Sequence, residues 1–288
     1  MDKILYGKDV NESIENELND KIKLLNAKGV KPKIAIVRVG ENPGDIFYEK
    51  AACKKADKLS VEHNSIAFDR NIAQEELIET IKELNDDRDI HGILLLRPFP
   101  KHMDDDKVRN SVIPEKDIDG ITDASLIGIV TGEHKGFSPC TPKACIEILK
   151  YYGKPLEGKN VTIVGRSLVV GKPLSLLMTN ENANVTVCHS KTKKEDMIKH
   201  CSFADILVLA TGKTESFTHE YLSDGQVIID VGTGVGKDGK MAGDLDINEV
   251  KESGLRRLSL TPVPKGVGSV TTAMLMSNLI EAAEKNPD

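Results

Sequence analysis

KNVTIVGRSLVVGKPLSLLM (159–178) is the stretch that decides the fold. Its first residues form a short β-branched apolar run that is typical of a buried strand, and its last residues have the apolar spacing of a helix. The backbone N–H groups at the start of such a helix make an anion site that suits a pyrophosphate. Gly165 and Gly171 flank the turn, but Ser167 and Val170 interrupt the GxGxxG spacing. Taken alone, the turn is therefore equally consistent with an ordinary strand–helix connection.

The same alternation of short apolar runs with longer amphipathic segments continues in both directions along the chain. Strands are expected at 33–40, 64–69, 92–98, 159–165, 183–190, 204–212 and 225–234. Helices are expected at 45–59, 73–87, 141–153, 171–182 and 270–286. This pattern predicts parallel βαβ units and hence an α/β fold with two lobes.

We expect the closing helix to return to the first lobe. The first domain is then predicted over residues 1–138 together with 270–288, and the second domain over 139–269. A cleft between two such lobes is where a small molecule usually binds.

The composition limits the classes of partner. The 288 residues carry a net charge of −6, which gives no electrostatic case for nucleic acid. The five cysteines show neither a CxxC pair nor zinc spacing, which is typical of reduced thiols in the cytosol, and the histidines show no metal spacing. The N-terminus is too charged for a signal peptide, and no apolar run approaches membrane length. We therefore expect a cytoplasmic protein without a metal or membrane partner.

The segment CHSKTKK (188–194), which follows the next predicted strand, bears on the choice of dinucleotide. It comes about 25 residues after the glycine turn, where an NAD site usually places an acid on the ribose 2′-hydroxyl. Here Ser190, Lys191 and Lys193 occupy this region, and Arg166 lies in the turn itself. Cations and a hydroxyl suit a 2′-phosphate, so the sequence favours NADP over NAD. The alternative for the lysines is a solvated basic loop.

Five motifs, taken in order and spacing, carry a resemblance to a known family. They are PEKDIDG (114–120), PCTP (139–142), GRSLVVGKP (165–173), DVGTG (230–234) and TPVPKGVGSVT (261–271). Over nearly its full length the chain resembles the methylenetetrahydrofolate dehydrogenase/cyclohydrolase family.

The resemblance implies a folate-binding N-terminal lobe and a Rossmann-like NADP-binding lobe, usually within a homodimer. Such enzymes oxidise 5,10-methylenetetrahydrofolate to the 5,10-methenyl form with NADP⁺, within one-carbon metabolism and purine biosynthesis. Many then hydrolyse the methenyl form to 10-formyltetrahydrofolate. By position, the implied cofactor contacts are Gly165, Arg166, Ser167, Ser190 and Thr233.

The resemblance also assigns residues to the substrate. Asp119, the second acid of KDIDG, matches the residue that holds the pterin. A carboxylate can accept two parallel N–H bonds from an aminopyrimidinone, although a loop or helix-capping aspartate is the alternative. The loop that would close over the substrate contributes Pro262, Pro264 and Gly266. In this loop, Lys265 and Ser269 replace the family's usual Gly and Pro.

The helix segment YEKAACKK (48–55) departs from the family pattern at the hydrolytic site. Tyr48 matches the family's tyrosine, but the catalytic lysine position one turn later is Ala52, and only the later lysine remains, as Lys54. The glutamine that normally lies beside the catalytic lysine is replaced by Leu96. Tyr48, Lys54 and Asp119 remain the candidate catalytic residues. We therefore predict a dehydrogenase whose cyclohydrolase activity is weak or lost.

Two alternatives stay open at this stage. Lys55 returns to within about 20° of Tyr48 around the helix, but roughly 10 Å further along its axis, so a displaced lysine could preserve both activities. Alternatively, the chain could be a catalytically silent protein that binds NADP or folate. A shikimate dehydrogenase-like reductase would lack the KDIDG and TPVP motifs.

Overall fold

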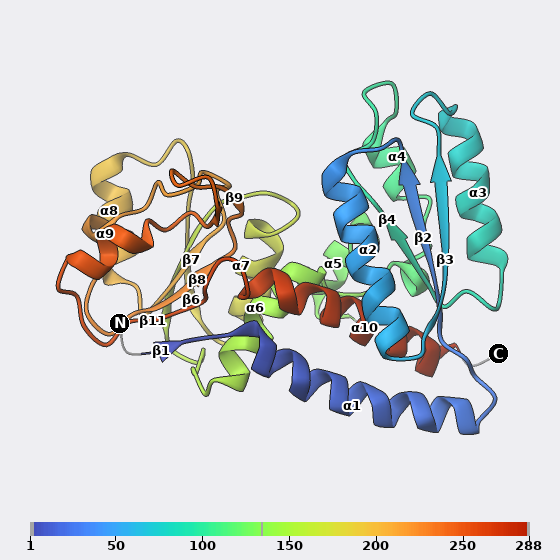
Figure 1. The fold of residues 1–288 in the computed structure, drawn as a ribbon, viewed down its shortest axis with the longest axis horizontal. Helices are drawn as coiled ribbons and strands as arrows, with labels where there is room; N and C mark the ends of the chain where they lie inside the picture. Colours follow the sequence, from blue (N-terminus) through green and yellow to red (C-terminus); the bar gives the residue numbers. More distant parts are fainter. Residues whose placement is uncertain (1–2, 134, 287–288) are drawn as a thin grey trace. The chain divides into compact units, whose positions relative to one another are not determined.

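The computed structural model describes residues 3–133 and 135–286, which form two compact α/β units (Figure 1). The six-stranded unit combines the start of the chain, up to Glu12, with Thr141–Thr271. The three-stranded unit combines Ser13–Cys140 with the segment from Thr272 onward. Because both main sheets are parallel, the predicted α/β class is confirmed.

The six-stranded sheet has a strand order that reverses beside β5. Its order is β1 (Lys3–Ile4), β11 (Ser259–Leu260), β8 (Val227–Asp230), β7 (Ile206–Leu209), β5 (Asn160–Val164) and β6 (Asn184–Cys188). The chain passes from β5 to β6 on one side and then returns to β7 on the other. In open α/β sheets, ligands bind outside the carboxyl ends of the strands at such a switch point.

Helices cover this sheet because its central strands are apolar throughout. The four residues of β7 and those of β8 are all buried, as expected for strands packed on both faces. The helices of the unit are α6 (Cys140–Tyr151), α7 (Gly171–Asn180), α8 (Lys194–Phe203) and α9 (Ile247–Glu252). Helices α8 and α9 pack on one face, and a short hairpin of β9 (Gly234–Val235) and β10 (Met241–Ala242) extends from the unit.

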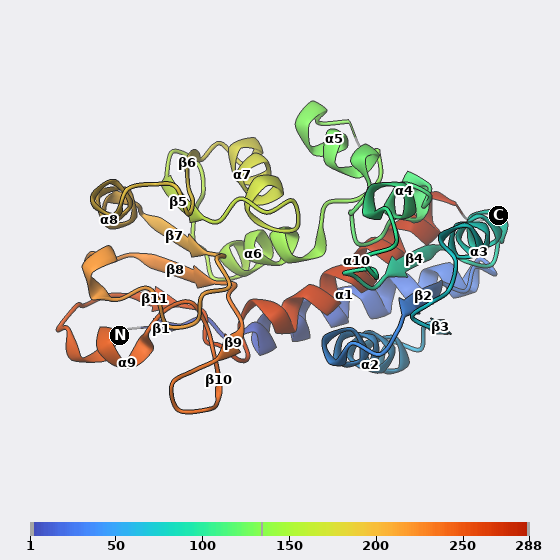
Figure 2. The same ribbon diagram turned by 90° about the horizontal axis from the view of Figure 1, so that it is seen from above.

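The three-stranded sheet repeats the same principle on a smaller scale. Its order is β3 (Glu62–Phe68), β2 (Lys33–Val39) and β4 (Gly92–Leu95), so its switch point lies between β2 and β4. Helices α2 (Pro43–Lys58) and α3 (Gln74–Asp86) cover opposite faces (Figure 2). The remaining elements are α4 (Asp105–Arg109), a 3-10 turn (Pro114–Lys116) and α5 (Asp123–Thr131). Helices α1 (Gly7–Ala27) and α10 (Val267–Lys285) contain residues of both units.

Alternation along β4 decides which helix each side chain meets. Ile93 and Leu95 belong to the cluster that includes α3 and α4. A Cβ added at Gly92, on the other face, would meet Leu279 of α10. Leu96 follows in the same alternation and is only 4% exposed. It is therefore a core residue on the α10 side of the sheet.

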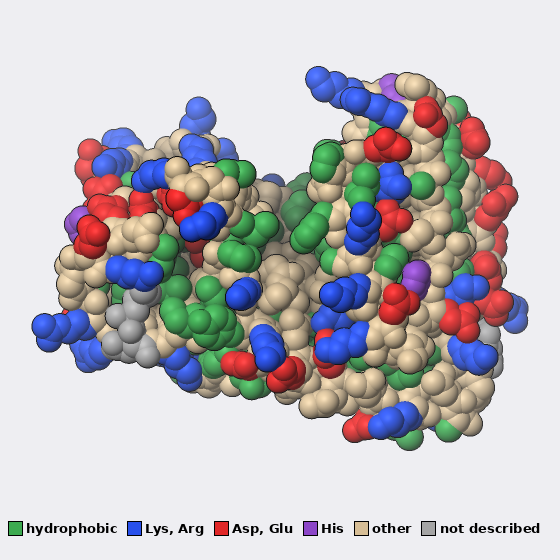
Figure 3. All heavy atoms as spheres, viewed as in Figure 1, with side chains coloured by type: hydrophobic (Ala, Val, Ile, Leu, Met, Phe, Trp, Pro, Cys, Tyr) green, Lys and Arg blue, Asp and Glu red, His purple; other side chains and the backbone are tan. Residues whose placement is uncertain are grey.

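Three further observations concern the described residues. None of their helices combines the length and the apolar character needed to cross a bilayer. Among residues 3–133 and 135–286, no group of three or more His, Cys, Asp or Glu side chains is placed to hold a metal. On the face drawn in Figure 3, acidic and basic side chains are interspersed.

Candidate functional site

Gly165 ends β5 at the switch point of the six-stranded sheet. Its backbone has a φ of +139°, and its N–H donates to the carbonyl of Cys188 at 2.9 Å. A Cβ at this position would collide with the carbonyl oxygen of Ala210, which follows β7. Only glycine therefore lets the ends of these two strands approach each other so closely.

Hydrogen bonds to Ser167 stabilise the turn that follows Gly165. The Ser167 hydroxyl accepts a hydrogen bond from the N–H of Val170 at 3.1 Å, and the Ser167 carbonyl accepts one from Lys172 at 3.0 Å. A side chain on Gly171 would strike the carbonyl of Gly165. Helix α7 thus begins directly against the glycine turn, with its first N–H groups at the carboxyl edge of the sheet.

The other sequence-predicted cofactor residues follow neighbouring strands. Arg166, Ser190 and Thr233 come just after β5, β6 and β8, and all three are exposed. Since the strands are parallel, these residues share one edge of the sheet. The loop after β6 is ordered by the N–H of Lys191, which donates to His189 Nδ1 at 3.2 Å. The structure brings two hydroxyls, a guanidinium and the glycine turn to one edge, which fits a phosphorylated dinucleotide.

Two buried acids at the same edge were missed by sequence reasoning. Asp230 accepts three backbone N–H bonds at 2.9–3.0 Å, from Gly232, Asp244 and Leu245. Burial raises the pKa of its carboxyl to about 7. Asp244 in turn accepts from the N–H and hydroxyl of Thr211 at 2.6 and 2.8 Å. Together these acids fix the loops that follow β7 and β8. The only sequence signal for them was the DVGTG motif, which contains Asp230.

In the three-stranded unit, the charge of Asp119 acts on the phenol of Tyr48. Tyr48 lies on α2, whose start is capped by the Asn42 side chain accepting from the N–H of Gly44 at 2.9 Å. Burial, together with the charge of Asp119, raises the pKa of the Tyr48 phenol well above its usual value. Asp119 keeps part of its surface open, yet burial raises the pKa of its carboxyl to about 7. The phenol is therefore neutral, and the carboxyl can exist in either form near neutral pH.

The two acids of KDIDG have different tasks. Asp117 is 1% exposed and accepts from the N–H groups of Ile121 and Thr122 and from the Ser125 hydroxyl, at 3.0, 2.8 and 2.6 Å. Thr122 caps α5 by accepting from the N–H of Ser125 at 3.1 Å. Thr122 thus caps α5, and Asp117 orders the segment before the helix by accepting backbone hydrogen bonds. Asp119 lies in the turn that they stabilise.

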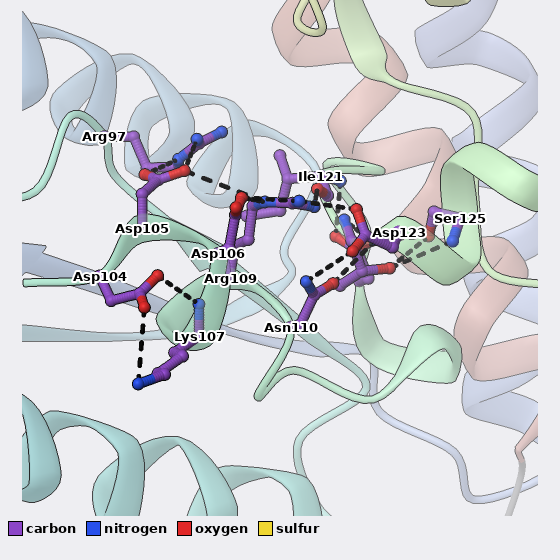
Figure 4. A network of polar contacts seen from close by, with 12 residues as sticks. Arg97, Asp104, Asp105, Asp106, Lys107, Arg109, Asn110, Ile121, Asp123 and Ser125 are labelled. Atoms are coloured by element: carbon purple, nitrogen blue, oxygen red, sulfur yellow. Dashed lines mark hydrogen bonds and ion pairs between the residues drawn. The ribbon is translucent and has the colours of Figure 1, made fainter.

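A buried arginine ties this segment to α4 (Figure 4). Arg109 is 6% exposed and donates to the Ile121 carbonyl at 2.9 Å. It also pairs with Asp106 at 2.9 Å and with Asp123 at 2.6 Å. Because charge-assisted bonds to several partners restrict rotation, this network holds the loop that carries the KDIDG acids.

The positions of the expected hydrolytic residues are apolar and buried. Ala52 is 0% exposed and Leu96 is 4% exposed. Lys54 is exposed. Lys55 donates to Glu15 of α1 at 2.6 Å, and Lys58 donates to the second oxygen of the same carboxylate at 2.5 Å. Burial raises the pKa of Glu15, but the two lysines outweigh burial, so the pKa is lowered. Lys55 is therefore engaged in an ion pair with an ionised carboxylate.

Comparison with known proteins agrees with this arrangement. The family described as "Tetrahydrofolate dehydrogenase/cyclohydrolase, catalytic domain" matches residues 5–119, and its NAD(P)-binding domain matches residues 139–287. The chain belongs to the tetrahydrofolate dehydrogenase/cyclohydrolase family. A curated member from Clostridium botulinum, "Bifunctional protein FolD", is 43% identical over 286 residues, covering 99% of this chain and 100% of the relative.

Solved structures of the family extend the likeness to three dimensions. The bifunctional enzyme FolD from Campylobacter jejuni has a TM-score of 0.93 at 35% identity, covering 98% of this chain and 99% of that one. The Trypanosoma brucei methylenetetrahydrofolate dehydrogenase-cyclohydrolase, solved with NADP cofactor and an inhibitor, has a TM-score of 0.90 at 29% identity. It covers 98% of this chain and 97% of that one.

In the TPVP loop, Lys265 occupies a backbone conformation that suits glycine. Lys265 adopts a φ of +84°, a left-handed conformation that glycine tolerates better than lysine. Its carbonyl accepts from the N–H of Gly7 at 2.9 Å. Gly266 is buried, and a Cβ there would strike the carbonyl of Pro262, whereas Pro264 is exposed.

Proposed function

We propose that this chain oxidises 5,10-methylenetetrahydrofolate to 5,10-methenyltetrahydrofolate with NADP⁺, and that its cyclohydrolase activity is weak or lost. The dehydrogenase part is supported by family membership and by two features of the structure: the glycine turn at Gly165 and the buried carboxyl of Asp119. The hydrolytic part is carried by one observation, the buried Ala52 on the helix turn that follows Tyr48.

NADP would be held by the edge of the six-stranded sheet. The pyrophosphate would lie against the glycine turn that precedes α7, because this turn and the start of the helix stand at the carboxyl edge of the sheet. Arg166 and Ser190, both exposed at that edge, would contact the 2′-phosphate. The bound nicotinamide supplies the hydride acceptor, whereas the protein supplies orientation.

The folate would be held through its pterin. In its ionised form, the Asp119 carboxyl can accept two N–H bonds from the aminopyrimidinone, and this contact favours ionisation of a group whose pKa lies at about 7. The neutral Tyr48 phenol can donate a hydrogen bond nearby. Hydride transfer asks for little more than this placement, because the neighbouring nitrogen lone pair of the substrate stabilises the developing cation.

Hydrolysis of the methenyl form needs a positioned proton acceptor, which typically contributes about 10²–10⁴-fold. Ala52 and Leu96 offer no titratable or hydrogen-bonding side-chain atom. Lys55, the candidate substitute, is engaged with Glu15 on α1. Because roughly 1 Å of misplacement already costs much in catalysis, a lysine one turn further along the axis does not replace the missing one.

The test follows both products. Purified protein is given methylenetetrahydrofolate and NADP⁺, and NADPH and the methenyl product are recorded against spontaneous methenyl decay. We expect matched accumulation of both. The paired variant Ala52→Lys with Leu96→Gln should accelerate methenyl decay, whereas Ala51→Lys, a matched control on the same helix, should not. If the methenyl product decays faster with the unaltered protein than it does spontaneously, the proposed loss of cyclohydrolase activity is wrong.

The remaining alternatives are outcomes of the same assay. If hydrolysis survives, Lys54→Met and Lys55→Met will identify a displaced lysine. If neither NADP⁺ nor NAD⁺ supports turnover, the chain is a silent binding protein. By analogy with the family we also propose a homodimer, which light scattering of the eluted protein tests directly.

A further inference from the structure

The side-chain amide of Asn278, on α10, donates hydrogen bonds to two backbone carbonyls of the three-stranded unit. Its side chain is 0% exposed. Nδ2 donates to the carbonyl of Ile118 at 2.8 Å and to the carbonyl of Ser138 at 3.1 Å. These two acceptors belong to separate segments, so one side chain fastens both of them to the helix.

The two segments are also in direct backbone contact. Ile118 immediately precedes Asp119, and Gly120, which follows, has a φ of +66°. A Cβ at Gly120 would lie 2.5 Å from the carbonyl oxygen of Phe137 and 2.6 Å from the nitrogen of Pro139. The turn that carries Asp119 is therefore nested against the segment that leads into α6, with no room for a side chain between them.

Cys140 supplies a second connection from Asn278 to Asp119. Its thiol, 1% exposed, lies 3.3 Å from the Ile118 carbonyl and 3.7 Å from Asn278 Nδ2. Burial raises the pKa of the Asp119 carboxyl, and its interaction with the same thiol lowers it. Asn278 thus contacts two neighbours of Asp119, the preceding carbonyl and the Cys140 thiol.

We propose that Asn278 is a positioning residue that orients the Asp119 carboxyl for two-point recognition of the pterin; this rests on the proposed function. Two parallel hydrogen bonds are strongly directional, so the carboxyl plane has to be fixed before the ligand arrives. Asp119 lies in a turn, where no regular ladder fixes its direction. The buried amide on α10 supplies this restraint, and a hydrocarbon side chain would leave the two carbonyls without it.

The test measures binding rather than turnover. Calorimetry with tetrahydrofolate compares the unaltered protein with Asn278→Ala, and we expect the affinity to fall about tenfold or more. Affinity for NADP⁺, which belongs to the other unit, should not change. The matched control is Asn85→Ala, because Asn85 Nδ2 also donates to a loop carbonyl, that of Ser111 at 2.7 Å, without reaching Asp119. This control should retain tetrahydrofolate affinity.

A double-mutant cycle separates positioning from general support. In the Asp119→Ala background, Asn278→Ala should cause no further loss of affinity, because the group it orients is gone. Equal losses in both backgrounds, or unchanged affinity in Asn278→Ala itself, would overturn the proposal. Asn278→Ser, which leaves a smaller cavity, replaces Asn278→Ala if melting shows that the latter does not fold. Unchanged affinity in Asp119→Ala would overturn the assignment of Asp119 and the proposal with it, whereas absent turnover in the unaltered protein would contradict only the dehydrogenase.

Discussion

Replacing Asp119 by Asn should make the protein more stable at pH 8 while weakening folate binding. Burial raises the pKa of this carboxyl from 3.8 to about 7 in the folded state. Between about pH 4 and pH 7, the folded state therefore binds more protons than the unfolded state. The stabilisation that goes with the raised pKa is fully present below about pH 4 and is lost as the pH rises to 7. Asparagine keeps the shape of the side chain but never ionises.

The magnitude follows from the size of the pKa shift. A change from 3.8 to about 7 is roughly three pKa units, which sets an upper limit of about 4 kcal/mol at pH 8. Because Asp119 stays partly open to solvent, we expect about half of this, ~2 kcal/mol. For a domain of this size the melting temperature should rise by about 4–8 °C.

Thermal melts between pH 4 and pH 8 provide the assay. Asp119→Asn should melt above the unaltered protein at pH 8 and converge with it near pH 4. Asp123→Asn is the control of opposite sign, because the hydrogen bond with Arg109 lowers the pKa of Asp123, so that variant should be less stable at pH 8. A difference for Asp119→Asn that is constant with pH, or a lower melting temperature at pH 8, would refute the reasoning.

Three further variants test separate parts of the structure. Arg109→Met should cost about 3 kcal/mol in urea unfolding because it strands buried partners, and a loss below about 1 kcal/mol would show that the network is dispensable. Lys265→Gly should raise the free energy of unfolding by up to about 1 kcal/mol by relieving the left-handed backbone, and a lower melting temperature would contradict this. Gly165→Val should abolish NADP⁺ binding in a titration through its collision with Ala210, while tetrahydrofolate affinity stays unchanged.

Local patterns were sufficient to predict the alternating strands and helices. Strands β2 and β5 were predicted because burial on both faces makes their apolar runs nearly continuous. Helix α7 was predicted from its apolar spacing, and the edge strand β3, which has no fully buried residue, within two residues. The prediction for β4 was too long: the strand ends at Leu95, before Pro98, which cannot donate to a sheet ladder. Helix α1 was not predicted, although its buried residues recur at helical spacing: Val10, Leu18, Ile22 and Leu25.

The parts of the site that escaped prediction depend on tertiary contacts. The pairing of Lys55 with Glu15 joins two helices 40 residues apart in sequence. Asn278 reaches the Ile118 carbonyl across 160 residues. No periodicity encodes such contacts, because each depends on how two elements dock. For that reason the sequence could show that Ala52 lacks an amine, but it could not show that the neighbouring lysine is already engaged.

Ala52 and Leu96 are apolar residues that suit the buried positions they occupy. A lysine at the fully buried position 52 would need a hydrogen-bonding partner to offset desolvation, and a glutamine at position 96 would likewise be costly alone. If the two polar groups serve as each other's partners, removing one would leave the other unsatisfied, and an apolar residue there would restore a satisfied core. We therefore expect Ala52→Lys and Leu96→Gln each to destabilise the protein singly, and the double variant to lose about 1–3 kcal/mol less than the sum in urea unfolding. Additive losses would mean that the two positions do not communicate, and that the two replacements arose for unrelated reasons.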